Sequence, residues 1–182
     1  MRALLILGLA VAASGCGNVS NMRAFSTDYV EPSADDTARL RVVTNGMVRG
    51  IPASDCIDWR VPGAGVMAVA KPGFADRNNG RRLGMPTGSW RLDEPNLASA
   101  ELKVPAGKPF TLNYLSEGYG SAGQTRSCRQ SYHFVPKAGQ DYEVIFYEAG
   151  GCVVVLRRLH TEGWTEAVPM QRAGLCRMSD ML

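Results

Sequence analysis

The five cysteines are the residues of this 182-residue chain whose chemistry is easiest to read. Cys16 follows an apolar run, whereas Cys56, Cys128, Cys152 and Cys176 are spread over the rest of the chain. The four cysteines after Cys16 would fit two disulfides if the chain is exported, because exported proteins fold in an oxidising compartment. Zinc binding is the alternative use, but the chain has no C-x-x-C pair and only two histidines. We expect two disulfides and no metal site.

Catalysis by a nucleophile or by acid–base chemistry needs an activated group next to a base. The histidines, His133 and His160, lie in strand-like runs, and the chain has no G-x-S-x-G elbow. Asp55 and Asp58 flank Cys56, a spacing that solvated loops also produce. We therefore predict that the chain is not an enzyme; a hydrolase that uses both histidines is the alternative we favour least.

Residues 118–123 match the G-x-G-x-x-G pattern of dinucleotide-binding loops. Such a site needs a helix after the glycines, because the helix N-terminus binds the pyrophosphate. Here residues 124–127 lead into a strand-like run instead. We predict a flexible loop and no cofactor.

The 71–95 stretch is rich in arginine and lacks a hydrophobic period. Long irregular stretches inside a domain are uncommon and often functional, and Trp beside Arg offers stacking and cation–π contacts. One interpretation is a binding loop for an anionic partner, such as lipid head groups or a cell-wall polymer. The other is a solvated loop, which the composition favours. The candidate binding residues are Arg77, Arg81, Arg82, Trp90 and Arg91.

The composition of the chain argues against a nucleic-acid partner and indicates the fold class. The net charge of +3 is small and no basic cluster dominates, unlike the pattern of a nucleic-acid-binding domain. Twenty glycines, ten prolines and short apolar runs are typical of turns and strands rather than long helices. We expect an all-β domain with few or no helices and no nucleic-acid partner.

In an all-β domain, strands position the cysteines, histidines and arginines named above. The strands are predicted where apolar and polar residues alternate between turn signals. Residues 45–46 read Asn-Gly, a strong turn signal after the first strand. Residues 153–156 are apolar at consecutive positions, which predicts a central strand covered on both faces. The predicted strands are 38–44, 65–70, 98–104, 110–115, 127–135, 142–147 and 152–159.

Two segments repeat one pattern: residues 104–114 read VPAGKPFTLNY and residues 135–147 read VPKAGQDYEVIFY. Proline ends the outgoing strand and glycine accepts the positive φ of a turn, so each segment is interpreted as a hairpin. The pattern resembles hairpins of transthyretin-like and immunoglobulin-like domains. That resemblance implies an antiparallel β-sandwich, and some small lipoproteins of secretion machines have such a domain.

The predicted hairpins bear on the disulfide pairing. In a flat meander Cys128 and Cys152 both lie opposite Tyr147, two strands and about 9–10 Å apart. This exceeds the roughly 7 Å Cα limit for a disulfide, so a Cys128–Cys152 bond is disfavoured. We favour Cys56–Cys128 with Cys152–Cys176, while Cys56–Cys152 with Cys128–Cys176 stays open.

The N-terminus has the parts of an export signal. Arg2 precedes eleven uncharged apolar residues at positions 3–13, and the small residues Ser14 and Gly15 precede Cys16. A helix of that length would rise only about 16 Å, roughly half of a bilayer core. The site resembles the lipobox of bacterial lipoproteins, although Ala13 stands where that motif usually has Leu. The resemblance implies cleavage before Cys16 and lipidation of its thiol.

The resulting expectation is a signal peptide at 1–15, a flexible tether at 16–37 and a single β-sandwich domain at 38–182. Lipidation would add a diacylglyceryl group and an acyl chain such as palmitate, and three chains anchor firmly. Gly17, rather than Asp, resembles lipoproteins passed to the outer membrane. We expect a periplasm-facing outer-membrane protein, with inner-membrane retention or surface exposure as alternatives.

The expected role is binding or assembly in the envelope. An envelope protein is the first expected partner, as for a secretion-machine or envelope-complex component. The alternative is a ligand-binding, glycan-binding or inhibitor module that uses the 71–95 and 116–126 loops.

Overall fold

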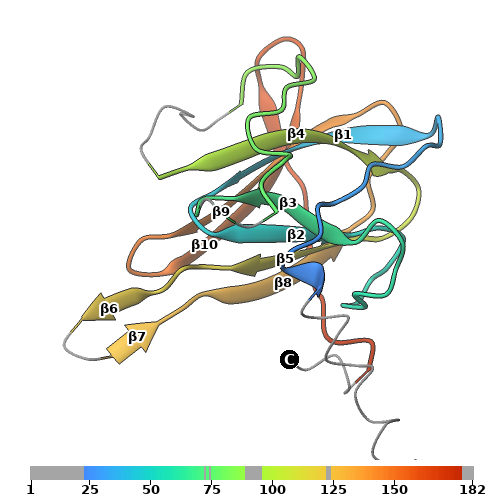
Figure 1. The fold of residues 1–182 in the computed structure, drawn as a ribbon. Helices are drawn as coiled ribbons and strands as arrows, with labels where there is room; N and C mark the ends of the chain where they lie inside the picture. Colours follow the sequence, from blue (N-terminus) through green and yellow to red (C-terminus); the bar gives the residue numbers. More distant parts are fainter. Residues whose placement is uncertain (1–22, 72, 74, 89–95, 122–123, 178–182) are drawn as a thin grey trace, which may run out of the picture.

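The computed structural model describes residues 23–71, 73, 75–88, 96–121 and 124–177. Within them two five-stranded sheets stack face to face, and a two-stranded hairpin extends from one end (Figure 1). Sheet I has the order β11-β10-β9-β1-β4, with strands Thr165–Ala167, Cys152–Leu159, Asp141–Glu148, Thr37–Thr44 and Ala98–Pro105. Sheet II has the order β12-β8-β5-β2-β3, with strands Gln171–Arg172, Arg129–Phe134, Phe110–Leu115, Met47–Ile51 and Gly65–Val69. The hairpin consists of β6 and β7, Tyr119–Ser121 and Gln124–Arg126.

The all-β sandwich predicted from the sequence is confirmed. Neighbouring strands pair antiparallel except for β1 and β9, which run parallel. All seven predicted strands are present, with ends that differ by a few residues. Sequence analysis missed β2 and the short strands β6, β7, β11 and β12, whose segments are too short or too mixed to show a period. In the described residues no helix is long and apolar enough to cross a membrane.

The two repeated segments are not hairpins. β4 lies in sheet I and β5 in sheet II, and likewise β8 lies in sheet II and β9 in sheet I. Each Val-Pro…Gly segment therefore carries the chain across the sandwich, and the two corners lie against each other: the Gly107 amide donates to the Pro136 carbonyl at 2.8 Å. Gly107 and Gly139 have φ of 71° and 69°, the left-handed region that glycine enters freely. The turn chemistry was identified correctly, but it allows a corner as well as a hairpin.

The disulfide prediction is wrong because it depended on those hairpins. The bonds are Cys128–Cys152, with Cα atoms 5.6 Å apart, and Cys56–Cys176, with Cα atoms 5.1 Å apart. Since β8 and β9 belong to different sheets, Cys128 and Cys152 face each other across the sandwich instead of lying two strands apart in one sheet. The first bond thus joins the two sheets, and the second fixes the C-terminal segment, which explains why this tail stays attached.

The predicted central strand is also wrong. β10 pairs with β9 along its whole length, but on its other side it meets only the three residues of β11. Val153 is 41% exposed, so one face of that strand is open to solvent. The central strand of sheet I is β9, and β1 lies beside it, between β9 and β4. The sequence of β1 is amphipathic because arginines occupy its outward positions, and another segment of the chain covers Arg41.

The space between the sheets holds one hydrophobic core. Tyr114 stacks on Phe146 with ring centroids 5.2 Å apart, and Phe110 meets Phe134 edge to face. The side chains of Leu40 and the other inward residues of β1 fill the middle of this core. Both sheets therefore contribute through alternate residues, as in other sandwiches.

The N-terminal boundary of the domain lies earlier than predicted. Residues 23–36 were expected to be part of the tether, but Ala24 and Tyr29 are buried to 3% exposure. Tyr29 donates its amide to the Val66 carbonyl of β3 at 2.8 Å and its hydroxyl to the Lys103 carbonyl of β4 at 3.1 Å. The domain therefore begins by residue 23. The signal peptide, Cys16 and the rest of the predicted tether lie outside the described residues.

Candidate functional site

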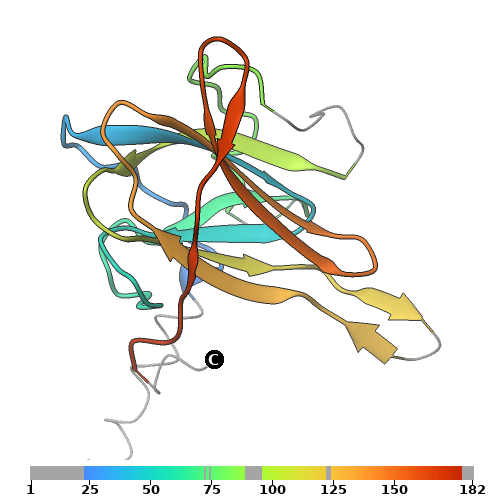
Figure 2. The ribbon, with the colours of Figure 1, turned by 180° about the vertical axis from the view of Figure 1, so that it is seen from behind.

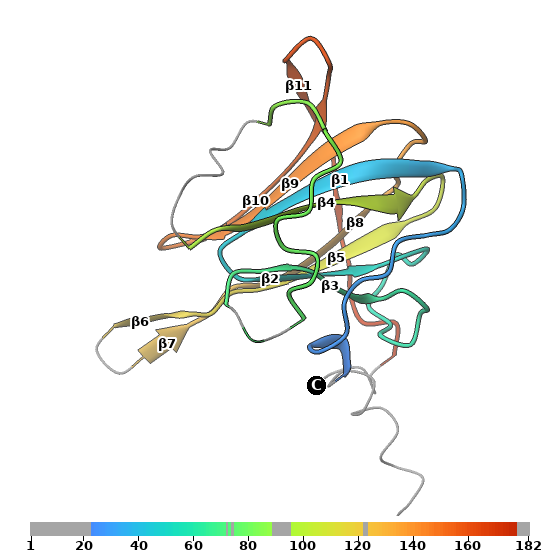
Figure 3. The same ribbon diagram turned by 45° about the horizontal axis from the view of Figure 1, so that its top comes forward.

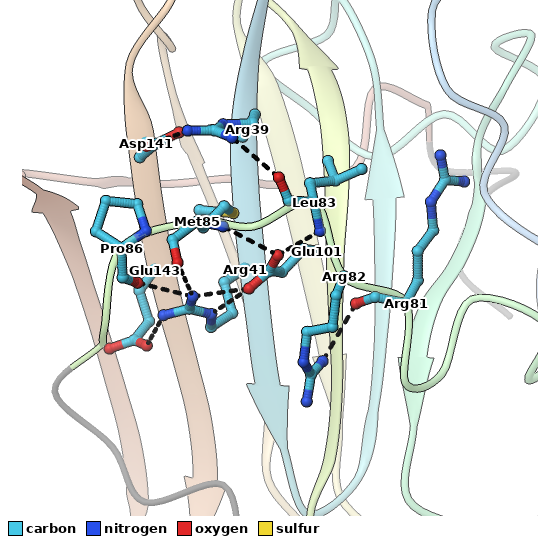
Figure 4. A network of polar contacts seen from close by, with 10 residues as sticks. All are labelled: Arg39, Arg41, Arg81, Arg82, Leu83, Met85, Pro86, Glu101, Asp141 and Glu143. Carbon is cyan, nitrogen blue, oxygen red and sulfur yellow. Dashed lines mark hydrogen bonds and ion pairs between the residues drawn. The ribbon is translucent and has the colours of Figure 1, made fainter. Parts of the chain in front are cut away.

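The outer face of sheet I carries a buried network of charges (Figure 4). Strand alternation turns Leu40 into the core and Arg41 outward, between Glu101 of β4 and Glu143 of β9, its cross-strand neighbours. The Arg41 guanidinium donates to Glu101 at 2.7 Å and to Glu143 at 3.3 Å. All three side chains belong to residues that are 4% exposed or less. Charges so far from water need a cover, and a distant segment provides it.

Residues 81–88, called the clamped segment here, lie across this network (Figures 3 and 4). Arg41 donates to the carbonyls of Met85 and Pro86 at 3.2 and 2.8 Å. The Glu101 carboxylate accepts the amides of Leu83 and Met85. A Cβ at Gly88 would overlap the Glu143 carboxylate, so a larger residue at this position would have to displace that carboxylate. A segment without regular structure is thus held by side chains from the sheet.

Ionisation of the network is favoured by its own hydrogen bonds. Burial opposes the charge on Glu101, but the Leu83 amide and the Arg41 guanidinium outweigh it and lower the pKa of this carboxyl. Next to it, Arg39 forms two bonds of 2.6 Å to Asp141, which raise the pKa of the guanidinium. Arg39 also donates to the Leu83 carbonyl at 3.1 Å. These bonds therefore favour the charged forms of Glu101 and Arg39.

Of the candidate binding arginines, Arg81 and Arg82 begin the clamped segment and Arg77 precedes it. The side chains of the three form none of the bonds between this segment and Arg41 or Glu101. Arg81 pairs with Glu31 at 2.6 Å and keeps 42% of its side chain exposed. Arg82 is exposed and donates to the Arg81 carbonyl. Arg77 is 88% exposed, with Asp28 at 3.7 Å. Three arginine side chains thus remain accessible at the start of the clamped segment and just before it, whereas Trp90 and Arg91 lie outside the described residues.

Sequence analysis missed the polar residues that fix this region to the sheet edges. Glu31 accepts the Lys103 amide of β4 at 2.7 Å in addition to its pair with Arg81. Asn78 donates to the carbonyls of Tyr29 and Val66, and Asn79 exchanges two bonds with the main chain of Val69. The Asn-Asn-Gly run in the sequence indicated a turn. Nothing in it showed that the amides would bind strands ten or more residues away.

A second buried cation lies on the outer face of sheet II. The Arg49 guanidinium is stacked between Phe25 at 4.0 Å and Trp59 at 3.9 Å, and it donates to Asn113. Burial, together with the charge of Arg129, lowers the pKa of Arg49 to about 9. The Trp59 indole packs on Arg49 and is only 8% exposed.

The two histidines lie in different sheets. His133 is in β8 of sheet II, while His160 follows β10 of sheet I and stacks on Trp164 with ring centroids 3.4 Å apart. Asp58 accepts a bond from Arg60 at 2.7 Å, which lowers the pKa of its carboxyl. The described contacts of these side chains are with packing or ion-pair partners, so the structure does not bring the proposed histidine pair together.

The glycine motif of residues 118–123 leads into a hairpin of short strands. Residues 118–121 enter the β6–β7 hairpin, and a strand rather than a helix follows the glycines. In the part of the chain that the structure describes, no three His, Cys, Asp or Glu side chains cluster as metal ligands. An open hollow of about 550 Å³ borders Asp28, Asp76 and Arg77. It adds a polar surface beside the accessible arginines.

The geometry therefore shows a polar surface on sheet I whose main chain is fixed by buried side chains. Comparison with known proteins adds no family to this description: no family model, no curated protein and no solved structure matches the chain.

Proposed function

We propose that this chain is a lipoprotein of the bacterial outer membrane, anchored through lipid on Cys16, whose β-sandwich faces the periplasm and acts by binding or assembly. The export signal and the lipobox-like site support the anchor. Two disulfides in the described residues fit an oxidising compartment. The chemistry expected of it is recognition of a partner, without a cofactor and without catalysis.

The observation that carries the binding role is the clamped segment. Buried ion pairs are weak contributors to stability, because desolvation offsets their attraction. Here they instead fix the main chain at residues 83–86 in one position. Rigid support of an irregular segment is what a recognition surface requires, and loops held by a scaffold commonly carry binding.

The orientation of the domain supports the same proposal. Residues 23–25 enter against the outer face of sheet II, where Phe25 covers Arg49. The clamped segment lies on the outer face of sheet I, at the opposite side of the sandwich (Figure 1). Only residues 16–22 would separate the lipid from the domain, at most about 24 Å of extended chain. An anchored domain would thus present the clamped segment to the periplasm and not to its own membrane.

The anchor is tested by fractionation of cells that produce the full chain. Cys16→Ser should leave the protein unprocessed or release it from membranes. Gly17→Asp is the matched control: it should stay lipidated but shift toward the inner membrane. A Cys16→Ser protein that is still processed and membrane-bound would disprove the lipoprotein proposal.

The binding role is tested by crosslinking in envelope membranes followed by purification of the lipidated protein. A stoichiometric envelope protein that is lost in the Arg81→Ala/Arg82→Ala variant supports assembly through the clamped surface. Arg172→Ala is the control, since this exposed arginine lies on β12, away from the clamp. A co-purified glycan or small molecule instead of a protein would favour the ligand-binding alternative. A partner that is retained by the double variant would place the binding surface elsewhere.

A further inference from the structure

The edge strands of the two sheets are covered to different extents on the two sides of the sandwich. On one side, backbone bonds from residues 27 and 29 reach Val66 of β3, and bonds with residues 80 and 81 reach Ser99 and Glu101 of β4. Both edges there are covered by the chain itself. On the other side, one extended stretch, residues 164–173, pairs first with β10 and then with β8 (Figure 2). It leaves the first half of β10 uncovered.

The uncovered groups follow from the hydrogen-bond pattern of β10. The Val168 amide donates to the Leu156 carbonyl, and the His160 amide donates to Trp164. Even-numbered residues of β10 therefore turn their backbone groups away from β9, because the direction alternates along a strand. Cys152 and Val154 point the same way, and in the described chain no strand pairs with them on that side.

This edge lacks the features with which proteins protect exposed strands. Such edges are usually blocked by Lys, Pro, a bulge or a covering segment. Residues 152–155 read Cys-Val-Val-Val and pair with β9 in unbroken register. Val153, on the outer face of the sheet, is 41% exposed. The Cys128–Cys152 bond fixes the start of the strand, so the edge is presented in a rigid form.

We propose that the occupant of this edge is a second copy of the same chain, paired antiparallel through β10 around a two-fold axis at Val153. In that arrangement the Cys152 amide donates to the Val154 carbonyl of the other copy, and the Val154 amide donates to its Cys152 carbonyl. The two Val153 side chains then face each other as a non-hydrogen-bonded pair, with Cα atoms about 4.5 Å apart. The contact joins both copies of sheet I into one continuous sheet.

A membrane-anchored second copy fits this edge for a geometric reason, and this step rests on the proposed lipid anchor. The two-fold axis of an antiparallel strand pair is perpendicular to the sheet, so it keeps each face of the sandwich on the same side in both copies. Residues 23–25 enter on the outer face of sheet II in each. Both lipids would thus reach one membrane. Confinement to that membrane raises the effective concentration, so a contact of few residues suffices.

The test uses two differently tagged full-length chains, produced together and crosslinked in membranes before purification. Wild-type copies should co-purify. Val153→Lys in both copies should reduce the co-purified fraction at least tenfold, because two ammonium groups would face each other. Val153→Lys in one copy with Val153→Glu in the other should restore it. Val135→Lys in both copies is the control, since Val135 is 51% exposed in the β8–β9 corner.

Each other outcome overturns the proposal. If wild-type copies fail to co-purify, β10 does not pair in the membrane; if the double Lys form still associates, the contact lies elsewhere. Thermal unfolding of each variant shows whether the fold is intact, and Val154→Pro is a second probe that removes one outward amide donor without adding charge. Membrane fractionation of the same samples separates loss of pairing from loss of the anchor.

Discussion

The two sides of the sandwich are closed by different means. On the β3–β4 side, segments far away in sequence close the sheets through buried charges and amide side chains, with Arg41, Glu101 and Asn79 as central contacts. On the β10–β8 side, the Cys128–Cys152 bond and the extended 164–173 stretch close them, and within the described residues no strand covers the first half of β10. The difference shows that irregular segments here act as structural covers. Where no cover exists, the exposed strand is free to pair with another chain.

Breaking the clamp should have the largest effect. Arg41→Ala leaves the carboxylates of Glu101 and Glu143 buried without the cation that pairs with them. Removal of one member of a buried ion pair lowers the free energy of unfolding by about 3–5 kcal/mol. Urea unfolding of the mature domain measures this loss, and hydrogen exchange should show faster exchange at the Leu83 and Met85 amides. Arg82→Ala, an exposed neighbour, should change the stability by less than about 0.5 kcal/mol. Equal losses in both variants would contradict the role of the clamp.

Removing the Cys128–Cys152 bond breaks the closure of the other side. The bond spans 24 residues, for which the loop-entropy model gives about 3.5 kcal/mol. Cys128→Ala/Cys152→Ala should lose that amount in urea unfolding, and amide exchange should rise first at the start of β10. Cys56→Ala/Cys176→Ala is the comparison variant, in which exchange should rise in the C-terminal segment instead. Faster exchange on the β3–β4 side of the Cys128/Cys152 variant would show that the two sides are coupled.

Uncovering the edge of β3 should have a smaller effect. Asn79→Ala removes two bonds to the Val69 main chain, and because Asn79 is exposed, water replaces part of them. The expected loss is about 1 kcal/mol, measured by thermal unfolding. The Val69 amide should exchange faster than in wild type. Asp76→Ala, an exposed residue of the same turn, should leave both quantities unchanged.

The free energy of unfolding at acidic pH should depend on Glu101. Its pKa is lower in the folded state than its ordinary value, so the carboxylate stabilises the fold above that ordinary value. This contribution is lost as the pH falls through the lowered pKa. Urea unfolding between pH 7 and pH 2 should therefore show a shallower acid decline in Glu101→Gln than in wild type. Glu117→Gln, an exposed glutamate, should follow the wild-type curve.

The sequence predicted the fold class and most of the long strands because these depend on local patterns. The run ARLRVVT of β1 alternates and the run before Pro105 does too, so both strands were found. The same patterns do not say which sheet a strand joins. Val-Pro and Ala-Gly signals mark a reversal of direction, and a reversal within a sheet looks the same in sequence as a crossing between sheets. The error in the disulfides followed from that ambiguity.

The candidate site was predicted in part. The 71–95 stretch was identified as a candidate loop, and Arg81 and Arg82 are indeed accessible there. Its anchoring was not foreseen, because Arg41 lies 44 residues from Met85 and 60 from Glu101 in the chain. Outward arginines on an alternating strand ordinarily face water. Only the segment that covers them makes them buried.

By itself the sequence determined that this chain folds into strands joined by Gly and Pro turns, and that four cysteines are available for two bonds. These follow from backbone preferences and residue chemistry, which act over a few positions. The tertiary structure alone decided which cysteines meet, which arginines are buried and which strand edge stays open. Those outcomes depend on contacts between residues far apart in the chain, such as Cys56 with Cys176, and no local pattern encodes them.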